Sequence, residues 1–170
     1  GVVSVGNRIL YTGDAGVQWT PVATGSGGAG LFNFEFSGGT TGYAAGDHSQ
    51  LLRTTDGGES WSAVVGDDAL RGQAVNSISC GTQSSCVVSL VGSASILRTE
   101  DGGKNWTATV AGGRRIGGAA FVGGARVIAV GESGLLVLSE DAGASWRAIG
   151  GSVDGAFRGV SVSSKLAAAV

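Results

Sequence analysis

The chain has 170 residues, of which 42% are hydrophobic and 14% charged, and its formal net charge is −2. This length and apolar content suit a single folded domain, whereas the slightly acidic balance argues against a nucleic-acid-binding protein, which normally carries a basic excess. Gly occurs 33 times and Pro once without a Gly-X-Y period, which excludes collagen and indicates many tight turns. No apolar run approaches the roughly 20 residues needed to span a bilayer.

The first segment, residues 1–23, contains two short apolar runs, VVSV and RILY, followed by the phrase TGDAGVQW. The second, residues 31–66, contains LFNFEF, GYAAG and QLLR, followed by TTDGGESW. The third and fourth, residues 74–110 and 116–150, repeat this order with TEDGGKNW and SEDAGASW. Short apolar runs separated by glycines predict strands, and helical periodicity is absent.

A phrase that reads S/T-x-D-x-G-x-x-W, here called the Asp box, therefore occurs four times and contains all four tryptophans. Its aspartates, Asp14, Asp56, Asp101 and Asp141, are separated by 42, 45 and 40 residues. Four strands in a unit of roughly 40 to 45 residues are typical of a propeller blade. We predict an all-β fold, a β-propeller of four-stranded antiparallel blades, as a single domain over residues 1–170.

The Asp box has a structural explanation. The carboxylate can accept backbone N–H groups of its own turn, the Ser or Thr hydroxyl can tie the incoming strand to it, and Gly permits a positive φ. The Trp can bury its ring between neighbouring blades. One identical acid per blade forms no converging site, so we assign structural rather than catalytic roles. The residues concerned are Asp14, Gly16, Trp19, Asp56, Gly58, Trp61, Asp101, Gly103, Trp106, Asp141, Gly143 and Trp146.

Cys80 and Cys86 flank the turn-like sequence GTQSS within the third unit. Two antiparallel strands would bring them opposite each other at a separation that a disulfide can bridge. Two reduced core thiols are the alternative. We favour the disulfide, and with it an extracytoplasmic compartment such as the periplasm, the thylakoid lumen or the cell exterior.

The two ends of the chain do not divide evenly into blades. Residues 1–23 supply strands two to four of one blade, and residues 157–170 (FRGVSV and KLAAAV) supply strands one and two of another. A closed ring of four blades is one interpretation. A segment of a longer propeller is favoured, because exposed blade edges would invite pairing with other chains. The start at Gly-Val-Val-Ser and the lack of Met also predict a processed or truncated product.

The whole chain resembles the BNR or Asp-box propeller superfamily. The phrases LLRTTDGGESW and ILRTEDGGKNW are most similar to the photosystem II assembly and stability factor family and its bacterial relatives. This resemblance implies a lumenal or periplasmic scaffold that docks onto subunits of a membrane-protein complex, with an arginine-rich patch that binds the partner. Arg53 and Arg98 match the Arg of the family's LRT phrase, whereas Tyr11 and Leu138 occupy that place in the other two repeats.

The edge opposite the Asp boxes is the predicted place for function. Arg71, Arg115 and Arg158 each lie at the entry to a first strand and could form an arc that binds a carboxylate or an acidic protein surface. Ordinary solvated loops are the alternative. The other candidates on these loops are Arg114, Asp47, His48, Asp67, Asp68, Glu132 and Asp154.

A glycan-active or glycan-binding propeller is the competing hypothesis. Sialidase chemistry needs a Tyr–Glu pair, yet Tyr11 and Tyr43 fall inside predicted strands without an evident acidic partner. A xyloglucanase-like site could use Asp67 or Asp68 with Asp154. With His48 as the single histidine, no multi-histidine metal site is expected, and no cofactor is predicted. We therefore predict a non-enzymatic, protein-binding scaffold.

Overall fold

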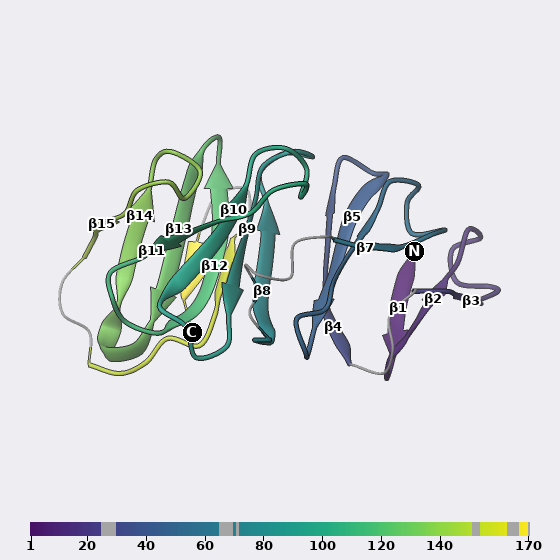
Figure 1. Ribbon diagram of the computed structural model, residues 1–170, viewed down its shortest axis with the longest axis horizontal. Coiled ribbons are helices and arrows are strands. Elements are labelled where there is room, and N and C mark those ends of the chain that lie inside the picture. The colour runs from purple at the N-terminus through teal and green to yellow at the C-terminus, as the bar shows by residue number, and fades with distance from the viewer. Residues whose placement is uncertain (25–29, 65–69, 71, 151–153, 163–166, 170) are drawn as a thin grey trace.

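The computed structural model describes residues 1–24, 30–64, 70, 72–150, 154–162 and 167–169. It contains antiparallel sheets that follow one another in chain order, from the β1–β3 sheet at one end to the β12–β15 sheet near the other (Figure 1). The predicted fold class, an all-β propeller of four-stranded antiparallel blades, is confirmed. The described part of the chain has one short 3-10 helix, η1 (Glu132–Gly134).

Three of the sheets have four strands, each pairing with the next in sequence. They consist of β4 (Leu31–Ser37), β5 (Thr41–Gly46), β6 (Leu51–Thr54) and β7 (Ser62–Ala63); β8 (Val75–Cys80), β9 (Cys86–Leu90), β10 (Ser95–Thr99) and β11 (Thr107–Val110); and β12 (Ile116–Gly123), β13 (Arg126–Gly131), β14 (Leu136–Ser139) and β15 (Arg147–Ala148). The chain also forms β1 (Val2–Val5), β2 (Arg8–Tyr11) and β3 (Thr20–Val22), and a pair of strands β16 (Val160–Val162) and β17 (Ala167–Ala169).

In two of the four-stranded sheets the second strand ends where two backbones approach closely. A Cβ on Gly46 would collide with the carbonyl oxygen of Gly30, and one on Gly131 would collide with that of Arg115. Only glycine fits such a position without moving the neighbouring chain. This packing explains why the GYAAG and VIAVG segments both end in Gly.

The hydrophobic core lies between successive sheets. One cluster joins Tyr43 and Leu51 of the second sheet to Val88 and Leu97 of the third. The next cluster joins the third sheet to the fourth, and another joins Ile9 of the first sheet to the second. The second and third sheets thus bury both faces against their neighbours, which is the packing expected of blades.

The first strands of the sheets are tied by polar side chains. The backbone N–H of Cys80 donates to Glu35 Oε1 at 3.2 Å, and that of Phe121 donates in the same way to Ser79 Oγ at 3.1 Å. Glu35 and Ser79 occupy equivalent places in β4 and β8, since they pair with Tyr43 and Val87 respectively. These bonds satisfy backbone groups that a first strand would otherwise leave unpaired.

The prediction that the box tryptophans bury their rings between blades holds fully for Trp61, which is 6% exposed, and in part for Trp106 and Trp146. It is wrong for Trp19, which is 40% exposed. Trp106 packs edge-on against Tyr43 of the preceding sheet, with ring centroids 6.4 Å apart. No sheet precedes β1–β3 among the described residues, so the Trp19 ring has no equivalent surface to cover.

Candidate functional site

The four Asp boxes close the turn between the last two strands of their sheets with one pattern of hydrogen bonds. In the second box the Thr54 hydroxyl donates to Asp56 Oδ1 at 2.6 Å and accepts the Gly58 N–H at 3.0 Å. Asp56 Oδ1 also accepts the Ser60 N–H at 3.0 Å. The first, third and fourth boxes repeat all three bonds.

These bonds also set the protonation state of the box aspartates. Hydrogen bonds from the N–H and the side chain of Asn105, with a smaller effect from the Thr99 hydroxyl, hold the pKa of Asp101 well below its usual range. The Ser145 hydroxyl and N–H and the Ser139 hydroxyl lower the pKa of Asp141 to about 2. A carboxylate that holds its charge so firmly, with its oxygens already bonded, is unsuited to proton transfer. The chemistry of the box is that of a structural turn.

A disulfide joins Cys80 and Cys86, whose Cα atoms lie 4.0 Å apart directly across the β8–β9 pair. The hairpin that it closes contacts its own Asp box, because the Gly102 N–H donates to the Ser84 carbonyl oxygen at 3.0 Å. The disulfide therefore braces the Asp-box edge of the third sheet.

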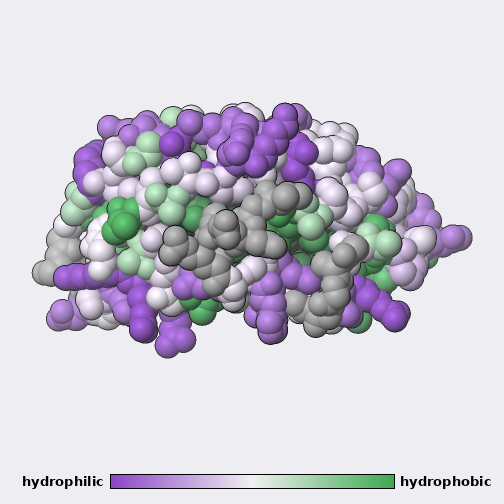
Figure 2. Space-filling model, viewed as in Figure 1, coloured by the Kyte–Doolittle hydropathy of each residue, from purple (hydrophilic) through white to green (hydrophobic). Residues whose placement is uncertain are grey.

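The edge opposite the Asp boxes brings together two of the arginines predicted to form an arc. Arg115 and Arg158 line one groove of about 490 Å³ together with Glu132, Val91 and Phe157. Arg115 lies 3.6 Å from Glu132, and both side chains are more than half exposed, so their ion pair is weak and both groups stay accessible. Both rims of the molecule are hydrophilic in the space-filling view, with apolar patches between them (Figure 2).

The other candidates on this edge are more scattered. The Arg114 side chain donates to the Ser133 carbonyl oxygen at 2.7 Å, which directs it onto η1. Asp154 and His48 are exposed, and His48 occupies a turn with a φ of 53°. Arg71, Asp67 and Asp68 lie outside the described residues.

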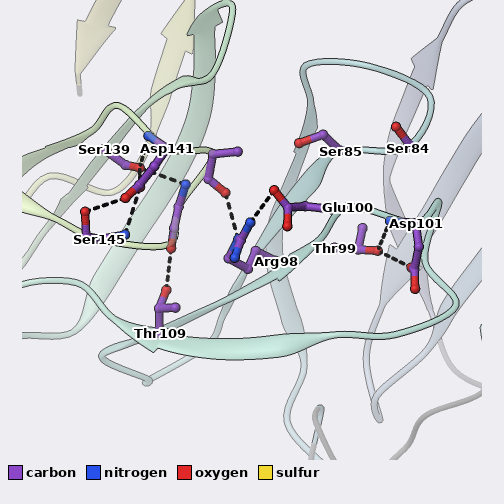
Figure 3. A network of polar contacts seen from close by, with 12 residues as sticks. Ser84, Ser85, Arg98, Thr99, Glu100, Asp101, Thr109, Ser139, Asp141 and Ser145 are labelled. Carbon is purple, nitrogen blue, oxygen red and sulfur yellow. Dashed lines mark hydrogen bonds and ion pairs between the residues drawn. The ribbon is translucent and has the colours of Figure 1, made fainter.

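The two arginines of the LRT phrase lie on the Asp-box edge and differ from each other. Arg98 is engaged, because its Nη2 lies 2.6 Å from Glu100 Oε1 and its Nε donates to the Ala142 carbonyl oxygen at 3.2 Å (Figure 3). Arg53 has a buried Nε without a hydrogen-bond partner and lines a groove of about 310 Å³. The assignment of these arginines to partner binding stays a prediction.

The part of the chain that the structure describes has no group of three or more His, Cys, Asp or Glu residues placed to hold a metal ion. It also has no helix that is long and apolar enough to span a membrane.

Stacked four-stranded sheets, each closed by an Asp box, define the class of this protein as a BNR-type β-propeller. Residues 2–120 match the family model described as photosynthesis system II assembly factor YCF48. The chain belongs to this family. None of the curated proteins matches it significantly.

Solved structures of propellers agree with this class. The structure of YCF48 bound to a D1 peptide has a TM-score of 0.65 and 21% identity, over 78% of this chain and 44% of that chain. YCF48 from Cyanidioschyzon merolae has a TM-score of 0.60 and 26% identity, over 69% of this chain and 39% of that one. An ancestral GH74 enzyme has a TM-score of 0.58 and 16% identity, over 78% of this chain and 20% of that enzyme, which shows the fold alone. The chain thus spans less than half the length of either YCF48 structure.

Sequence reasoning missed two acids on the Asp-box edge that pair with other side chains. Glu100 holds Arg98, and Glu59 accepts the Tyr11 hydroxyl at 3.0 Å across the first two sheets. Both acids occupy variable positions of the Asp box. A position-by-position comparison of the repeats could have singled them out, since Lys104 stands where the second box has Glu59 and Thr55 stands where the third has Glu100.

Proposed function

We propose that this chain is a non-catalytic, protein-binding part of an assembly factor for a membrane-protein complex, such as a photosynthetic one. The observation that carries the proposal is the family match over residues 2–120. It is supported by the peptide ligand of the related YCF48 structure, which is a segment of D1. The ligand that we propose for this chain is a peptide with at least one carboxylate.

The groove between Arg115 and Arg158 suits such a ligand. Two exposed guanidinium groups can form paired, charge-assisted hydrogen bonds with carboxylates. Val91, which is 54% exposed, and Phe157 offer apolar contact beside them. We further propose an extracytoplasmic location, which the Cys80–Cys86 disulfide supports, because disulfides persist in oxidising compartments.

A peptide-binding titration tests this proposal. We expect a fluorescent D1 peptide to bind the wild-type protein, and the double substitution Arg115→Ala and Arg158→Ala to weaken binding by about tenfold or more, as expected for the loss of charge-assisted hydrogen bonds. Arg126→Ala is the matched control, because Arg126 is an exposed arginine on the β12–β13 hairpin at the other edge. Equal binding by the double variant and the wild type would refute the role of the groove. Hydrolysis of xyloglucan or a sialoside by the purified protein would instead support a glycan-active propeller.

A further inference from the structure

A cavity of about 640 Å³, a volume typical of sites for small ligands, lies along the first strands β4, β8, β12 and β16. Residues two apart in a strand share a face, so Asn33 and Glu35 of β4 form one polar stretch of its wall, and Ser77 and Ser79 of β8 form another. Phe121 of β12 adds an aromatic ring. The described residues that line the cavity include one acid, Glu35, and no Lys, Arg or His. An ionised Glu35 therefore has no cation beside it on the wall.

Glu35 is half-buried and reaches across to the neighbouring sheet, where its Oε1 accepts the Cys80 N–H at 3.2 Å. Within the part of the chain that the structure describes, its carboxylate makes no ion pair. Burial raises the pKa of Glu35, with a smaller opposite effect from the Cys80 N–H. A carboxylate that has lost part of its water without gaining a cation is held less firmly in its charged form. It would gain from a cationic ligand.

The next sheet performs the same structural task with a neutral side chain. Ser79 occupies the place of Glu35, and its Oγ accepts the N–H of Phe121 at 3.1 Å. Bracing the next first strand therefore needs a hydroxyl and not a charge. The carboxylate of Glu35 adds a cost of desolvation that the hydroxyl of Ser79 does not have. Such a cost without a structural gain is expected of a group that serves a ligand.

Phe121 provides a second group that attracts cations. A Cβ placed on Gly81 would lie 2.6 Å from the Phe121 Cδ1, so the ring lies directly against Gly81. Gly81 follows Cys80, the residue that donates to Glu35. The carboxylate from the second sheet and the ring from the fourth therefore contact two consecutive residues of the third. An aromatic ring attracts an ammonium group through its face, in addition to the attraction of a nearby carboxylate.

We propose that this cavity binds an alkylammonium group, with Glu35 as its counter-ion and Phe121 beside it. The three N–H donors of an ammonium can be shared among the Glu35 carboxylate, the Asn33 amide oxygen and the Ser79 hydroxyl, which all line the cavity. A metal ion is not favoured, because the described residues include no group of three or more His, Cys, Asp or Glu placed to hold one. The lysine side chain of a polypeptide and a free amine both carry an alkylammonium group. The site is separate from the Arg115–Arg158 groove and does not rest on the proposed function.

The probe is a short fluorescent peptide with a single lysine and both ends blocked, titrated by anisotropy. The same peptide with acetyl-lysine is its control, since acetylation removes the charge. We expect the lysine peptide to bind the wild type and Glu35→Gln to weaken binding by about tenfold or more. Glu35→Gln can still accept the Cys80 N–H, and a thermal melt checks that it folds. Glu140→Gln is the matched control, because it makes the same exchange at an exposed acid of the fourth Asp box and should bind like the wild type.

Two further measurements address the ring and the source of the ligand. Phe121→Leu removes the attraction of the ring but keeps an apolar side chain, and we expect it to weaken binding by about threefold. Pentylamine, used as a competitor, carries the same ammonium group without a peptide backbone. Displacement of the lysine peptide by pentylamine at a similar concentration would support a free amine as the ligand. Displacement only at much higher concentrations would support a lysine side chain.

Three results would overturn the proposal. The wild type could bind the lysine and acetyl-lysine peptides equally, or bind neither, which would show that the cavity does not select an ammonium group. Glu35→Gln could bind as tightly as the wild type, so that Glu35 would not be the counter-ion. Equal losses from Glu35→Gln and Glu140→Gln would show only a general attraction of acidic groups for cations. Arg115→Ala with Arg158→Ala should leave binding of the lysine peptide unchanged, so failure of the groove and failure of this site can be told apart.

Discussion

Trp61 and Trp19 occupy the same position of the Asp box but differ in burial, so their replacement by Ala isolates the effect of burying the ring. Trp61 is 6% exposed and makes edge-on contacts with Phe34 and Phe36, with ring centroids 6.0 and 6.1 Å away. Trp19 is 40% exposed. Each indole donates to the carbonyl oxygen of its own box glycine at 3.1 Å, so the loss of that bond is common to both variants.

The expected losses of stability follow from the buried area. A tryptophan buries up to about 250 Å², which at about 25 cal/mol per Å² gives an upper estimate of roughly 6 kcal/mol for a fully buried ring. Replacement of a buried Trp by Ala typically costs about 3–5 kcal/mol, and we expect about 4 kcal/mol for Trp61→Ala. Because Trp19 keeps 40% of its surface in water, we expect about 2 kcal/mol for Trp19→Ala.

Urea unfolding followed by circular dichroism measures both losses, since fluorescence would change with the number of tryptophans. With a slope of about 2 kcal/mol per M, Trp61→Ala should lower the midpoint by about 2 M and Trp19→Ala by about 1 M. Equal shifts of the two urea midpoints would refute this prediction, because they would mean that burial of the ring does not determine how much it stabilises the fold.

Three further predictions concern charge and the disulfide. The pKa of Asp141 is lowered in the folded protein, so its ionised side chain should stabilise the fold fully above about pH 4, which is its pKa in the unfolded chain, and less as the pH falls towards about 2. The melting temperature of Asp141→Asn should therefore depend less on pH over this range than that of the wild type. Burial raises the pKa of Glu35, so Glu35→Gln, which can still accept the Cys80 N–H, should melt at the same or a higher temperature at pH 7; a lower melting temperature would contradict this. The double substitution Cys80→Ser and Cys86→Ser should cost about 2 kcal/mol by loop entropy, and dithiothreitol should destabilise the wild type but not this variant.

The turn chemistry of the Asp box could be predicted because its partners are close in sequence. Thr54, Asp56 and Gly58 span five residues, and their hydrogen bonds and positive φ follow from side-chain type alone. The spacing of 40 to 45 residues between successive boxes then predicted four short strands in each unit. Local rules of this kind predicted the sheets and the strand order within them.

Contacts between sheets could not be predicted in this way, because they join residues more than thirty positions apart. Tyr11 and Glu59 are 48 residues apart, and Glu35 and Cys80 are 45. The exposure of Trp19 likewise depends on what lies beyond its sheet, not on its own motif. The match of Arg53 and Arg98 to one family phrase therefore made them look equivalent, although Glu100 neutralises one of them.

Because the Asp box is repeated, equivalent positions can be compared within one chain. The Thr, Asp, Gly and Trp positions of the box hold the turn, so the variable positions between them can change with little effect on folding. Thr55, Glu59, Glu100 and Lys104 occupy such positions and are exposed. Glu100 nevertheless pairs with Arg98, and Glu59 accepts the hydroxyl of Tyr11 from the neighbouring sheet. The charges on the Asp-box edge can therefore differ from sheet to sheet while the turn that closes each sheet stays the same.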